Sequence, residues 1–95
     1  MITVQEAQEL LRKGLRREAE AAYRQVLETS PDNVEALNIL GNMALNRGDA
    51  AQALQLLQRA ALAAPNDAVT RHRIARAHDA MGNVDSLTVV PGGVR

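Results

Sequence analysis

The chain has 95 residues and no cysteine, and its eleven basic residues balance its eleven acidic ones. This length allows one domain with a modest core, the absence of thiols excludes disulfides and thiolate catalysis, and the balanced charge argues against nucleic acid or an anionic membrane as a partner. No segment approaches the ~20 apolar residues that span a bilayer, and the N-terminus does not look like a signal peptide. We therefore expect a cytoplasmic protein with no membrane contact.

Helix-forming residues dominate the chain, and the first predicted helix begins at a capping box. Thr3 is followed three residues later by Glu6, a spacing that satisfies two backbone groups at a helix start. This helix is expected to end at Gly14. A second helix over about 16–29 shows apolar residues at three- and four-residue spacing, and the proline-containing turn over 30–33 stops it.

Three further helices are predicted in the rest of the chain. Asn33 caps the third, and Gly48 closes it by supplying the left-handed backbone that a helix end often needs. Asp49, with Gln52 three residues later, caps a fourth that runs to about residue 64, and a fifth occupies about 68–81. Turns this short make successive helices antiparallel neighbours.

An internal repeat of 34 residues underlies this pattern. Three glycines, Gly14, Gly48 and Gly82, stand at this spacing, and so do the following sets: Ala19 with Ala53, Pro31 with Pro65, Asn33 with Asp67, and Ala7 with Gly41 and Ala75. Small residues such as Gly41 and Ala53 let two helices of a pair approach closely, so the larger leucines can fill the grooves beside them. The repeat therefore predicts paired helices joined at small residues.

The central unit, residues 34–67, resembles the tetratricopeptide repeat. The resemblance rests on seven positions of that family's pattern: Leu37, Leu40, Gly41, Gly48, Ala53, Ala60 and Pro65. It implies an all-α fold, a right-handed superhelical stack of antiparallel helix pairs (an α-solenoid) of about five helices. The expected repeats are 1–33, 34–67 and a partial third over 68–82.

The third repeat breaks off after Gly82 in the sequence. Residues 83–95 include a run of β-branched side chains and Pro91, which is costly inside a helix, so an irregular or disordered tail is expected there. The face that a missing helix would cover carries Ile74, Ala77 and Met81. Repeat arrays usually end in a polar capping helix. These three residues are therefore predicted to support self-association into a homo-oligomer.

The resemblance also implies a binding surface, because the first helix of each pair lines the concave side of such arrays. Five polar residues are candidates to contact a protein or peptide partner there: Gln8, Asn38, Asn42, His72 and Arg76. Their amide and guanidinium groups suit a peptide backbone or a carboxylate. The alternative is that they are solvated helix surface. A carboxylate clamp known in some relatives matches at one of five positions, Arg73, so binding of a C-terminal tail is disfavoured.

No catalytic motif is present in the sequence. Phosphate-binding glycine loops, nucleophile elbows and zinc-binding HExxH segments are absent, and His72 and His78 point in different directions on one helix. No cofactor or metal is expected, and the chain is predicted to be a protein-binding scaffold and no enzyme. The alternative function is a self-association arm, or the N-terminal repeat region of a larger bacterial enzyme, that dimerises through the third repeat.

Overall fold

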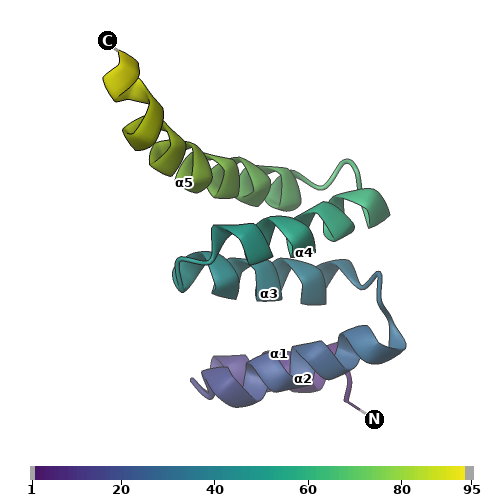
Figure 1. Cartoon of the computed structure of the whole chain (residues 1–95). Helices are drawn as coiled ribbons and strands as arrows, with labels where there is room; N and C mark the ends of the chain where they lie inside the picture. Colours follow the sequence, from purple (N-terminus) through teal and green to yellow (C-terminus); the bar gives the residue numbers. More distant parts are fainter. Residues whose placement is uncertain (1, 94–95) are drawn as a thin grey trace.

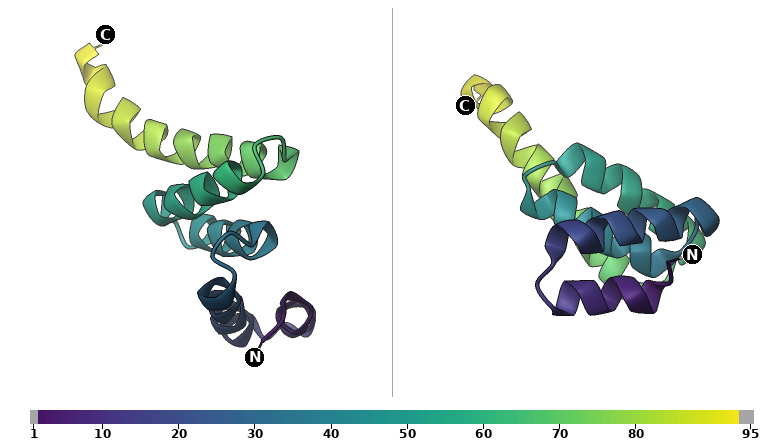
Figure 2. Two further views of the ribbon diagram at one scale, coloured as in Figure 1. Left: turned by 90° about the vertical axis from the view of Figure 1, so that its right-hand side faces the viewer. Right: turned by 90° about the horizontal axis from the view of Figure 1, so that it is seen from below.

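A computed structural model describes residues 2–93, with side-chain surroundings over residues 2–82. It contains the following helices: α1 (Val4–Arg12), α2 (Arg16–Thr29), α3 (Val34–Asn46), α4 (Ala50–Ala63) and α5 (Ala68–Gly93). Successive helices run antiparallel and stack in chain order (Figure 1). Helices α1 and α5 lie at opposite ends of this stack (Figure 2). The predicted all-α stack of helix pairs is confirmed.

Side-chain caps begin three of the helices where the sequence predicted them. The Thr3 hydroxyl accepts from the backbone N–H of Glu6 at 3.2 Å, and the Glu6 carboxylate accepts from the backbone N–H of Thr3 at 2.9 Å. Asn33 accepts from the backbone of α3 at 2.9 Å, and Asp49 accepts from that of α4 at 3.1 Å. Helix α2 begins without such a bond, because Leu15 occupies its N-cap position. Local sequence therefore fixes most of the helix starts.

Two of the three regularly spaced glycines end helices. Gly14 and Gly48 have φ angles of +83° and +86°, the left-handed region that other residues rarely adopt. Gly82 does not adopt this conformation, and α5 continues through Gly93. This corrects the expectation of an irregular tail for residues 83–93, whereas residues 94–95 lie outside the described part. Without a left-handed residue at 82 nothing turns the backbone, and β-branched residues disfavour a helix by less than about 1 kcal/mol each.

The apolar core consists of two clusters that share α3. The first joins α1, α2 and α3 around Tyr23, which is completely buried. The second joins α3, α4 and α5 and contains Leu57, Ala53 and Ala77, which are also completely buried. Gly41 lies against the second cluster, because a Cβ atom there would stand 2.8 Å from the Cγ atom of Leu57. The predicted close approach of α3 and α4 at small residues is confirmed.

Candidate functional site

The first helices of the two pairs, α1 and α3, together with α5, carry four of the five predicted contact residues as accessible side chains. We use the name inner face for the contact surface that the sequence predicts for Gln8, Asn42, His72 and Arg76. Gln8, His72 and Arg76 are exposed and Asn42 is half-buried. Within residues 2–82, the side chains of Asn42, His72 and Arg76 make no hydrogen bond or ion pair, whereas Gln8 donates from Nε2 to the Glu35 carboxylate. Three of these polar groups therefore have no protein partner in the described part.

Asn38, the fifth predicted contact residue, is placed differently from the prediction. Only 6% of its surface is exposed, because α5 covers it. Its Nδ2 atom donates to the Thr70 hydroxyl at 2.7 Å and to the Val34 carbonyl at 3.1 Å. The prediction that Asn38 points into an open groove is therefore wrong. Thr70 is completely buried at the start of α5, and its position fixes the Asn38 side chain between two helices.

A buried polar network thus joins the second and third repeats. The Thr70 hydroxyl donates a hydrogen bond to the Asp67 carboxylate at 2.6 Å, and this bond is the main cause that lowers the pKa of the Asp67 carboxyl. Arg73 donates from Nη1 to the backbone carbonyl of Asn38 at 3.1 Å. Burial, and then the nearby Arg76, lower the pKa of the Arg73 guanidinium. Arg73 is therefore held against α3 and is less available to a partner than Arg76.

A cleft of about 420 Å³ opens between α1 and α3 beside the inner face. It is lined by Gln8, Leu11, Arg12, Tyr23, Glu35 and Ile39. The Tyr23 hydroxyl is buried and has no hydrogen-bond partner. Burial, and secondly the Glu35 carboxylate, raise the pKa of this hydroxyl, so it stays protonated. The sequence analysis did not predict this cleft. The one sequence feature that points to it is Tyr23, because it is the single aromatic residue of the chain and stands in the first repeat.

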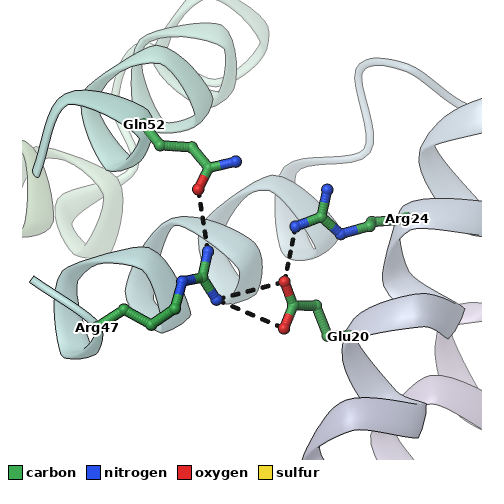
Figure 3. Close-up of polar contacts among 4 residues, drawn as sticks. All are labelled: Glu20, Arg24, Arg47 and Gln52. Carbon is green, nitrogen blue, oxygen red and sulfur yellow. Dashed lines mark hydrogen bonds and ion pairs between the residues drawn. The ribbon is translucent and has the colours of Figure 1, made fainter. Parts of the chain in front are cut away.

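A second hollow of about 330 Å³ lies between α2 and the end of α3, and arginines dominate it. It is lined by Arg16, Arg17, Glu20, Met43, Asn46 and Arg47. Glu20 pairs with Arg24 at 2.6 Å and with Arg47 at 3.3 Å, and Arg47 also donates to Gln52 at 2.9 Å (Figure 3). The bond from Arg24 is the main cause that lowers the pKa of Glu20. These contacts link α2 to α3 and α4, so several polar groups here already have partners.

The three residues predicted for self-association do not share one open face. Met81 is 39% exposed and Ile74 is half-buried. Ala77 is completely buried in the second core cluster, against α3 and α4. The prediction that Ala77 lies on an uncovered face is therefore wrong. The helices that cover it are α3 and α4, which precede α5 in the chain. Two further exposed apolar side chains are Leu62 at the end of α4, at 84%, and Val69 at the start of α5, at 51%.

Comparison with known protein families agrees with the helix pairs. A family model for the tetratricopeptide repeat matches residues 4–68, the span of α1 to α4 and the first residue of α5. The chain belongs to the tetratricopeptide repeat family. Such repeats are generally protein–protein interaction modules. No curated protein matches this tetratricopeptide repeat chain.

Two kinds of site are absent from the described residues of this tetratricopeptide repeat protein. Over residues 2–93, no helix has the length and apolar character to cross a membrane. The same part of the chain holds no group of three or more histidine and acidic side chains arranged for a metal ion.

Proposed function

We propose that the chain is a protein-binding scaffold that holds a protein or peptide partner on its inner face. The observation that supports this proposal is the set of unengaged polar groups of Asn42, His72 and Arg76 on α3 and α5. Amide, imidazole and guanidinium groups together can donate to and accept from a peptide backbone or a side-chain carboxylate. Binding of this kind needs no catalytic group, and the proposal includes a non-catalytic role and a cytoplasmic location.

Site-specific photo-crosslinking in the native host tests this proposal. A photoreactive amino acid at position 42 or 72 should capture the same partner protein. The same group at Gln25 of α2 or Gln55 of α4, which are exposed on the second helices of their pairs, should not capture it. Capture of one partner from all four positions, or from 25 and 55 alone, would refute the inner face as the binding surface.

A second proposed function is self-association through the last repeat. It is supported by the exposed apolar side chains of Val69 and Met81 on α5, the helix of the last repeat. Burying such side chains between two copies would be favourable by about 25 cal/mol per Å². Sedimentation at rising protein concentration tests it. A dimer that Met81→Asp dissociates supports self-association, and a monomer at all concentrations refutes it.

A further inference from the structure

The hollow between α2 and the end of α3 carries more positive than negative charge. Three of the residues that line it are arginines, and Glu20 is the one acidic residue among them. The Glu20 carboxylate is already shared by two arginines, at 2.6 Å from Arg24 and 3.3 Å from Arg47 (Figure 3). It is therefore not free to neutralise Arg16 and Arg17, the other two arginines of the hollow.

Arg16 and Arg17 have no partner within residues 2–82. Both side chains are exposed, and neither makes a hydrogen bond or an ion pair in this part of the chain. By contrast, the guanidinium groups of the following arginines each donate to an oxygen of the protein: Arg12, Arg24, Arg47, Arg59 and Arg73. Two guanidinium groups therefore stand unused beside one hollow.

The position of these two arginines does not stabilise the helix that carries them. Arg16 and Arg17 are the first two residues of α2, and Leu15 gives this helix no side-chain cap. The N-terminal end of a helix carries a partial positive charge, so cations in the first turn are unfavourable there. Neither a contact within the fold nor the charge of the helix end explains these arginines. A bound anion does explain them, because it would be attracted by both guanidinium groups.

The other groups of the hollow are mostly polar, which suits a polar segment of a protein. Met43 reaches the surface with only 6% of its area, so apolar contact contributes little to recognition here. Asn46 is exposed, and its amide makes no hydrogen bond within residues 2–82. An amide side chain can both donate to and accept from a peptide backbone. Charge and hydrogen bonds therefore decide what binds.

The placement of the arginines favours two carboxylates over one phosphate group. A guanidinium group binds one carboxylate through two parallel hydrogen bonds. Adjacent residues of a helix point about 100° apart, so Arg16 and Arg17 approach the hollow from different directions and suit two separate anions. A phosphate group concentrates about two negative charges at one point, which Glu20 of the same hollow would repel. Two carboxylates spread the same charge over two positions.

From this arrangement we infer that the hollow is a docking site for an acidic segment of a protein partner. Carboxylates of the segment pair with Arg16 and Arg17, and Asn46 hydrogen-bonds to its backbone. None of the residues that line the hollow belongs to the inner face, so this is a second contact surface and the inference does not rest on the proposed function. It also explains why two cations begin a helix that has no side-chain cap.

Peptide titrations of the full chain, followed by amide chemical shifts in NMR spectra, test the inference. The probe is an acetylated, amidated peptide in which two glutamates alternate with alanines, because alternate residues of an extended peptide lie on one side. It should shift the amides of Arg16, Arg17 and Asn46. It should also bind about tenfold more tightly than the same peptide with glutamines, as two partly exposed ion pairs provide. Equal affinity for the two peptides, or shifts confined to other parts of the chain, would overturn the inference.

Two further probes with the same total charge test the identity of the occupant. One is an alanine peptide with a single phosphoserine, and the other is a thymidine trinucleotide, whose two phosphate groups carry one charge each. Both should bind more weakly than the glutamate peptide. Tighter binding of the phosphoserine peptide or of the trinucleotide would overturn the assignment to an acidic protein segment.

Three variants complete the test. Arg16→Gln and Arg17→Gln should each weaken binding of the glutamate peptide about threefold, because each removes one of the two ion pairs. Arg71→Gln is the matched control, since Arg71 is also exposed and without an ion pair in residues 2–82 but lies on α5, outside the hollow. It should leave the affinity unchanged. An equal loss in Arg71→Gln would refute the site.

The melting temperatures of the same variants separate binding from a role in the fold. They should not fall in Arg16→Gln and Arg17→Gln, because each substitution removes a cation from the positive end of α2. If both melting temperatures fall, these arginines stabilise the fold, and the inference is overturned.

Discussion

Gly41 packs directly on Leu57, and this contact determines how closely α3 and α4 can approach. A Cβ atom at position 41 would lie 2.8 Å from the Cγ and Cδ2 atoms of Leu57. Ordinary contacts between carbon atoms are about 3.5–4.0 Å long. Leu57 is completely buried, so its side chain has no open space into which to move. Gly41→Ala should therefore overpack this core cluster, at a cost of about 1–3 kcal/mol.

The helix itself offsets part of this cost. Alanine in a helix interior is more favourable than glycine by about 0.5–1 kcal/mol. The free energy of unfolding of Gly41→Ala should therefore fall by roughly 1–2 kcal/mol. In a chain of this size the melting temperature drops by about 4–8 °C per kcal/mol. Urea denaturation and thermal melts, both followed by circular dichroism, measure the two quantities.

Gly82→Ala is the matched control for this substitution. Gly82 also lies within a helix, but a Cβ atom there would meet no atom within 4 Å. The control should therefore raise the free energy of unfolding by about 0.5–1 kcal/mol, the helix-propensity gain alone. If Gly41→Ala matches or exceeds the parent chain in stability while Gly82→Ala behaves as expected, the packing of α3 on α4 described above is refuted.

Three further predictions concern the same interfaces. Thr70→Val removes the buried hydroxyl between Asn38 and Asp67, and it should lower the free energy of unfolding by about 1–3 kcal/mol in urea denaturation. The pKa of Asp67 is lower in the folded chain than in the unfolded one, so the ionised carboxylate raises the free energy of unfolding above the unfolded pKa, and this contribution is lost as the pH falls below about 4. In an acid titration of stability, Thr70→Val should therefore lose less free energy of unfolding than the parent chain. Ala53→Leu should cost about 1–3 kcal/mol by overpacking, and an unchanged thermal melt would contradict the buried position of this residue.

The helix boundaries could largely be predicted because local interactions set them. The side chains of Thr3, Asn33 and Asp49 reach backbone groups only three residues ahead, so sequence spacing is sufficient to place these helix starts. The continuation of α5 past Gly82 could not be predicted in this way. A glycine permits a left-handed turn without requiring one, and the same spacing gives turns at 14 and 48 and a continuous helix at 82.

The candidate site was predicted only in part, because burial depends on contacts that are distant in sequence. Helical periodicity places Asn38 and Asn42 one turn apart on α3, and both were expected in the groove. Thr70, which is 32 residues further along the chain, covers Asn38 and leaves Asn42 accessible. Likewise, periodicity places Ala77 on a face of α5, but only the approach of α4 determines that this face is inside. The cleft at Tyr23 depends on how far α1 stands from α3, which no local pattern encodes.

Tyr23 also gives the protein a built-in optical probe of one repeat. The sequence contains no tryptophan and no other tyrosine, so intrinsic fluorescence comes from this one buried side chain in the first core cluster. Circular dichroism, by contrast, averages over every helix. Repeat arrays are held together by contacts between neighbours, and their units can unfold separately when those contacts are weak. If the denaturation curves from tyrosine fluorescence and from circular dichroism coincide, the array unfolds as one unit. If the two curves separate, the fluorescence curve gives the stability of the first repeat on its own.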